Sequence, residues 1–159
     1  MILVYRGPLP AGGANKRTKE KHEIRRCFHS QIARAVKKPY WELFKDSPDF
    51  EGRRVGRFKF RPLICSDPFY PRRGCKLEIQ ALSHDPFGSI IQSADLDNRL
   101  KTLFDALCTP QENQLPAAET PKEDEEPFWV LLSDDRMITD FHFVQDILRT
   151  DRIAGPSYI

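Results

Sequence analysis

The sequence has no apolar run that approaches the length needed to cross a membrane, so a transmembrane helix is not expected. Residues 1–6 are too few and too soon charged for a secretory signal, and they are predicted to form a first strand instead. The protein is therefore expected to be cytoplasmic and to have no membrane partner.

Cysteine is scarce, and its spacing argues against a zinc site. None of the four cysteines, at positions 27, 65, 75 and 108, lies two residues from another. Structural zinc sites take Cys and His at short, regular spacings that this chain lacks. The thiols are therefore expected to stay reduced, as in ordinary cytosolic proteins.

Charge is abundant and unevenly distributed along the chain. Residues 1–76 hold 19 Lys and Arg against 7 Asp and Glu, a balance of +12. Residues 77–159 hold 6 against 16, a balance of −10. A basic half attracts phosphates and favours nucleic acid as a partner. The alternative is that the two halves attract each other within the fold.

The length of 159 residues fits one domain with a single core. Hydrophobic periodicity predicts two amphipathic helices, over residues 18–38 and 96–108. Short apolar or alternating runs predict five strands, over residues 1–6, 53–64, 75–82, 128–132 and 137–148. The second and third strands are expected to pair as a hairpin. The order β-α-β-β-α-β-β predicts an α+β fold, with a small mixed sheet, rather than a doubly wound parallel sheet.

Basic and apolar side chains alternate within the second predicted strand. Phe58 and Phe60 alternate with three cationic residues, which predicts one apolar and one basic face. A row of cations can follow a phosphate backbone, although a merely solvated face is the alternative. Two further arginines lie near the tip of the next turn-rich connection. The candidate DNA contacts are Arg57, Lys59, Arg61, Arg72 and Arg73.

Residues 109–127 contain four prolines and a run of four acidic residues at 123–126. This composition predicts a flexible, solvated insert. The insert could repel DNA or mask a site until it is displaced. Because surface loops tolerate insertions well, it is expected instead to hang in solvent.

Two groups of carboxylates are the most informative feature of the chain. Asp95 and Asp97 straddle one residue at the start of the second helix, and residues 134–135 form an Asp-Asp pair between the last two strands. Clustered carboxylates repel one another unless a cation neutralises them, and Mg²⁺ prefers oxygen ligands. Lys101 lies four residues after Asp97, on the same helical face, where its ammonium could contact a scissile phosphate.

The combination resembles the RusA family of Holliday-junction resolvases. The matching residues are Asp95-Leu96-Asp97-Asn98, then Lys101, then Phe104-Asp105-Ala106-Leu107, then Asp134-Asp135 and Asp140. The resemblance implies one RusA-like nuclease domain over residues 1–159. It also implies a homodimer that nicks four-way DNA junctions with Mg²⁺, for which Mn²⁺ is expected to substitute.

The same resemblance implies a role for each site residue. The metal carboxylates map onto Asp95, Asp97 and Asp135, and the catalytic lysine maps onto Lys101. These four residues are the expected catalytic set. The resemblance makes Asp134 a neighbour in the site rather than a principal ligand. The position of Asn98 suggests that it could orient Asp95, with helix capping as the alternative.

The implied function is the resolution of branched DNA by paired nicks during recombination and repair. A metal-activated water would attack the phosphodiester in line, and Lys101 would offset the developing negative charge. Two alternatives stay open. One is a related nuclease that acts on flaps, forks or RNA, and the other is a DNA-binding protein of the same fold that does not cleave.

Overall fold

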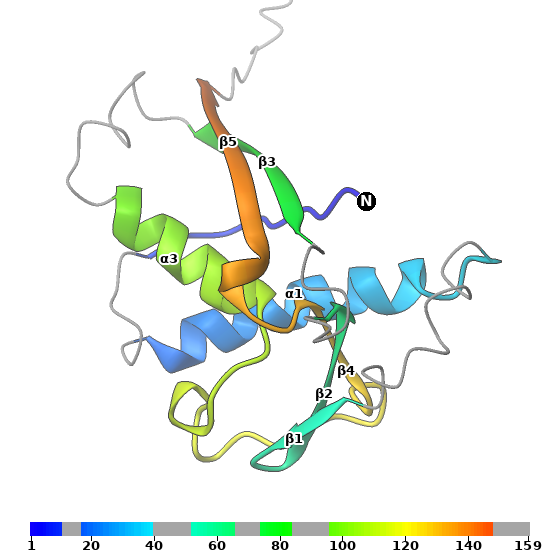
Figure 1. Ribbon diagram of the computed structural model, residues 1–159. Coiled ribbons are helices and arrows are strands. Elements are labelled where there is room, and N and C mark those ends of the chain that lie inside the picture. The colour runs from blue at the N-terminus through cyan, green and yellow to red at the C-terminus, as the bar shows by residue number, and fades with distance from the viewer. Residues whose placement is uncertain (11–16, 40–51, 66–73, 84–95, 148–159) are drawn as a thin grey trace, which may run out of the picture.

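The computed structural model describes residues 1–10, 17–39, 52–65, 74–83 and 96–147 (Figure 1). These residues confirm the predicted α+β class, with two α-helices, two short 3-10 helices and five strands. In chain order the elements are α1 (Thr18–Ala35), β1 (Arg53–Val55), β2 (Phe58–Ile64), β3 (Cys75–Ser83), α3 (Leu96–Leu107), η3 (Glu112–Gln114), β4 (Phe128–Leu132), η4 (Asp135–Met137) and β5 (Ile138–Ile147). None of the described helices is long and apolar enough to span a bilayer.

The strands form two sheets instead of one small mixed sheet. β1 pairs antiparallel with β2, and β4 lies parallel to β2 on its other side. β3 and β5 form a separate parallel pair. The predicted pairing of residues 53–64 with 75–82 is therefore wrong. The first of these segments folds back on itself at Gly56, whose φ of 56° lies in the left-handed region that favours glycine in a tight turn.

The first residues of the chain do not form the predicted strand. The side-chain amide of Gln31 on α1 takes the place of a neighbouring strand there. Its oxygen accepts from the Val4 N–H at 2.8 Å, and its nitrogen donates to the Val4 carbonyl at 2.7 Å. One side chain thus satisfies both backbone groups of Val4, so this part of the segment needs no partner strand.

α1 crosses the middle of the molecule in Figure 1, with α3, β3 and β5 above it and most of β1, β2 and β4 below it. Its apolar stripe of Ile24, Phe28 and Ile32 is buried in the larger core cluster. A second, smaller cluster lies between β1, β2 and β4 and is mainly aromatic, with Phe58, Phe60 and Phe128 in mutual ring contact. α1 packs against both β4 and α3, so it joins the two halves of the fold.

The acidic insert is bound to α1 and does not hang in solvent, so that prediction is wrong. Arg26 donates from Nε to Glu125 at 2.7 Å and from Nη1 to Glu119 at 2.7 Å. Its remaining nitrogen donates to the Thr120 carbonyl at 3.1 Å. Only 4% of the Glu125 side chain is exposed. The composition of the insert did not reveal this partner because Arg26 lies almost one hundred residues earlier in the chain.

His29 makes a second contact between α1 and the insert. Its Nδ1 accepts from the Trp129 N–H at 2.8 Å, so the ring hydrogen must be on Nε2, which lies 3.1 Å from the Asp124 carbonyl. The imidazole is 3% exposed. It therefore joins α1, β4 and the insert.

Replacing Arg26 with Met should detach the insert from α1. The buried Glu125 would lose its cation, and breaking a buried pair in this way costs about 3 kcal/mol. We expect Arg26→Met to lower the urea midpoint accordingly, whereas Arg34→Met, which alters an exposed arginine of the same helix, should stay within about 0.5 kcal/mol of the wild type. Equal midpoints for the two variants would contradict the proposed anchoring role of Arg26.

Candidate functional site

The first two turns of α3 present Asp97 and Lys101 together. Lys101 Nζ lies 2.7 Å from Asp97 Oδ2, as the spacing of four residues predicts. Both side chains are well exposed, at 74% for Asp97 and 60% for Lys101. An exposed pair of this kind contributes little to stability, so its groups can exchange this contact for a ligand at little cost. The neighbouring Asn98 accepts from the Thr102 hydroxyl through its backbone carbonyl, and its side-chain role stays a prediction.

The Asp-Asp pair lies at η4, between β4 and β5. Asp134 accepts from the Arg136 N–H at 2.9 Å and so caps this short helix. Partial desolvation, a hydrogen bond with Asp134, and the charges of Asp134 and Asp105 all raise the pKa of the Asp135 carboxyl. The Asp135 carboxyl therefore ionises less readily than a free carboxyl, a condition that a bound cation would relieve.

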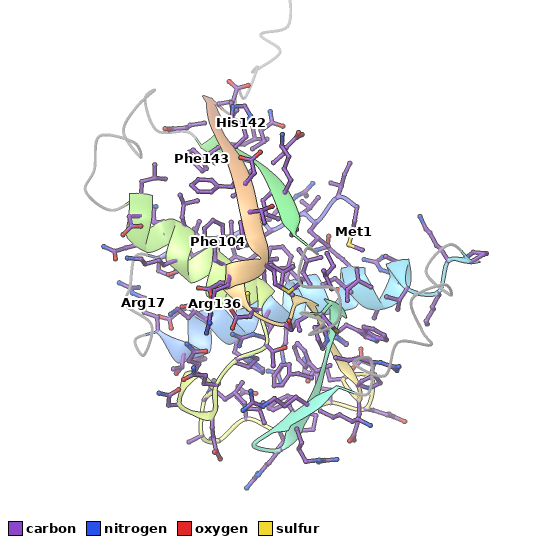
Figure 2. All side chains as sticks on the ribbon, in the orientation of Figure 1. Met1, Arg17, Phe104, Arg136, His142 and Phe143 are labelled. Atoms are coloured by element: carbon purple, nitrogen blue, oxygen red, sulfur yellow. The ribbon has the colours of Figure 1, made fainter. Side chains whose placement is uncertain are left out.

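Asp105 lies near the C-terminal end of α3, which packs against η4, and its charge acts on Asp135. Figure 2 shows Arg136 near that end of the helix. Burial, together with the charges of Asp135, Asp134 and Asp105, raises the pKa of the Cys108 thiol to about 12. The charges of all three carboxylates thus act on one buried thiol just after the end of α3.

The structure therefore shows two groups of predicted site residues. One contains Asp97 and Lys101 at the start of α3, and the other contains Asp134 and Asp135 near its end. Asp97 and Asp105 are eight residues apart, which is about 12 Å along a helix axis. No hydrogen bond or ion pair joins Asp97 to Asp135 among the described residues.

Asp95 lies outside the described residues, so its place in a three-carboxylate site stays a prediction. Within the described part of the chain, no group of three His, Cys, Asp or Glu side chains could hold a metal ion. The donor chemistry still fits Mg²⁺, which is often bound through one or two carboxylates together with water and substrate phosphate. Asp134 and Asp135 offer such a carboxylate pair.

A basic patch lies on the β1–β2 hairpin, and we define it as Arg54, Arg57 and Lys59. Arg54 and Lys59 are direct cross-strand partners, so two like charges share one face of the sheet. Such a pair is destabilising unless an anion lies nearby. Glu126 approaches Arg54 at 3.5 Å in an exposed pair that offsets only part of this charge. Arg54 was missed because the turn at Gly56 was not predicted.

Arg61 behaves differently from the other predicted DNA contacts. Its guanidinium lies 5.1 Å from the centre of the Trp129 ring and is only partly exposed. Burial lowers the pKa of the Arg61 guanidinium. Arg61 therefore has a packing role on the sheet, and its contact with DNA stays a prediction. The remaining candidates, Arg72 and Arg73, lie outside the described residues.

No protein-family model matches this chain, and no match to it was found among curated proteins or solved structures. The functional assignment therefore depends on the residues described above.

The crowding at η4 predicts that Asp135→Asn stabilises the metal-free protein. The raised native pKa means that ionisation of Asp135 costs native stability. This cost is absent below the ordinary carboxyl pKa of about 4 and grows as the pH rises through the native pKa. Thermal melts in EDTA should give a higher Tm for Asp135→Asn at pH 7 and a difference that shrinks towards pH 4.

The matched control for this measurement is Asp140→Asn. Asp140 makes an exposed pair with Lys76 at 3.4 Å, so its removal should change Tm little at any pH. A lower Tm for Asp135→Asn at pH 7 would show that Asp135 is a stabilising surface residue and not part of a crowded site.

Proposed function

We propose that the chain is a Mg²⁺-dependent endodeoxyribonuclease of the RusA type that cuts branched DNA, such as Holliday junctions, by paired nicks. Its place would be in recombination and repair, as a cytoplasmic homodimer. The observation that supports this best is the exposed Asp97–Lys101 pair on α3, together with the crowded Asp134 and Asp135 carboxylates beside the same helix. Surfaces that only bind DNA gain nothing from such a concentration of negative charge.

Each of these residues has a defined part in phosphodiester hydrolysis. Asp135, with its neighbour Asp134, would hold the cation at η4, and Asp95 and Asp97, which the resemblance adds to the ligand set, would have to reach it from the start of α3. Lys101 would offset negative charge on the scissile phosphate or the leaving oxygen. Mg²⁺, when bound, polarises the phosphodiester and lowers the pKa of a bound water. Since the Lys101 side chain is exposed, its ammonium can leave Asp97 for a phosphate without a large desolvation cost.

The basic patch on the β1–β2 hairpin would supply binding to the phosphate backbone. Its cations point to electrostatic recognition that is independent of sequence. A two-fold homodimer would present two equivalent sites to a junction with approximate two-fold symmetry, so that each site meets an equivalent strand. Paired nicks follow from that symmetry.

The central test is Asp97→Asn on an immobile four-way junction. We expect paired nicks from the wild type with Mg²⁺, none with EDTA, and a loss of at least about 100-fold in kcat for the variant, the size of effect that follows when an essential electrostatic group is removed. Gel-shift binding of the junction should persist or tighten in Asp97→Asn, because a carboxylate that faces phosphate has been removed.

Glu112→Gln is the matched control for this test. It makes the same carboxylate-to-amide change on the exposed η3 segment, and it should cleave as the wild type does. Equal cleavage by Asp97→Asn and the wild type would remove Asp97 from the site. Faster cutting of a flap, a fork or RNA than of the junction would favour the related nuclease with a different target. Metal-independent binding without any cleavage would favour the DNA-binding protein.

Removing a charge from the basic patch should weaken binding to all DNA sequences equally. For Lys59→Gln we expect the slope of log K against log salt to fall by about 1, as for the loss of one phosphate contact. Arg34→Gln, which removes an exposed charge from α1, should leave the slope unchanged. Fluorescence anisotropy over a salt series measures both slopes, and equal slopes would show that Lys59 is merely solvated.

A further inference from the structure

Two cations of α1 are completely buried. Lys21 and Arg25 are both 0% exposed and lie one turn apart, on the same face as Ile24. Burying a charge is expensive unless it is paired and hydrogen-bonded. Specific partners must therefore offset the cost of burying the Lys21 and Arg25 charges.

Both cations bind the same residue of α3. Lys21 Nζ lies 2.6 Å from the carboxylate of Asp105, and Arg25 Nη2 donates to the backbone carbonyl of Asp105 at 2.9 Å. That carbonyl belongs to the last turn of α3, where carbonyl groups lack a partner within the helix. A cation at this end is also favoured by the helix dipole. Lys21 and Arg25 thus fix the last turn of α3 through its side chain and its backbone at once.

The fixed residue lies between the two groups of the candidate site. Lys101 precedes Asp105 by one helical turn on the same face of α3. On its other side, the charge of Asp105 acts on Asp135 across the α3–η4 contact. Any rotation or sliding of α3 would therefore change the position of Lys101 relative to Asp135.

We propose that Lys21 and Arg25 are positioning residues that lock α3 against α1 and so set Lys101 and Asp97 in place relative to Asp135. The proposal rests on the nuclease function proposed above. Stability alone is a poor explanation for the buried pair, because replacing such a pair with neutral groups of similar volume is often neutral or stabilising. Geometric specificity is what the pair adds.

The test separates positioning from stability with a double replacement. Lys21→Met and Asp105→Asn each leave one charge without its main counter-charge, and each should lower Tm by about 10 °C. The double variant removes both charges and should return to within about 4 °C of the wild type. Its kcat on the four-way junction should nevertheless fall by about 10- to 100-fold, with KM within about threefold of the wild type, as expected when reacting groups are displaced by about 1 Å.

Two controls define a purely structural effect. Arg26→Met breaks the other large ion-pair cluster of α1 and should lower Tm without changing kcat per folded molecule. Lys21→Arg keeps a cation opposite Asp105 and should retain most of the wild-type kcat.

Hydrogen exchange gives a readout that needs neither metal nor DNA. In the double variant the amides of α3 should exchange at least about 10-fold faster than in the wild type at matched Tm, because the last turn has lost one of its two anchors. Wild-type kcat together with wild-type exchange in the double variant would overturn the positioning proposal. A wild type that cuts no branched DNA, but whose α3 is loosened by the double replacement, would refute the nuclease and leave the lock established.

Discussion

The structure depends on how α1 satisfies its charged side chains. An amphipathic helix normally turns such groups to solvent, but here Lys21, Arg25 and Arg26 are directed at carboxylates and carbonyls 80 or more residues later in the chain. Burial makes each contact strict, because a buried charge that loses its partner is costly. α1 therefore holds two elements that are distant from it in the chain, the insert and α3.

The local features of the fold could be predicted from the sequence. The 3.6-residue periodicity predicts α3 over 96–108, against the observed Leu96–Leu107, and the apolar run at 128–132 gives β4 as observed. The pairing of strands could not be predicted in this way. Alternation in residues 75–82 is equally compatible with a hairpin and with the parallel β3–β5 pair, because both place every second side chain on the same face. The contact of the insert with α1 was not predicted, because the composition of a segment does not show which distant residue it binds.

In the candidate site, too, the local contacts could be predicted from the sequence and the long-range contacts could not. The contact between Asp97 and Lys101 follows from helix geometry and was predicted. The grouping of Asp105 with Asp134 and Asp135 depends on the packing of α3 against η4, which no local pattern encodes. A signal for Lys21 and Arg25 was present but was not used. Both fall on the apolar stripe of α1 beside Ile24, and a charged residue at a core position indicates a buried partner.

The charge asymmetry of the chain has a use inside the fold as well as outside it. Among the described residues, four cations of the basic half form ion pairs with carboxylates of the acidic half, at Lys21, Arg26, Arg54 and Lys76. The attraction between the halves therefore accounts for part of the basic excess, and the buried pairs are unavailable to DNA. On the exposed part of the β1–β2 hairpin, Lys59 and Arg57 have no carboxylate partner among the described residues, so they stay available to phosphate. The proposed DNA contacts thus include a small patch whose charge can be measured, and the proposed catalytic groups lie near the two ends of α3.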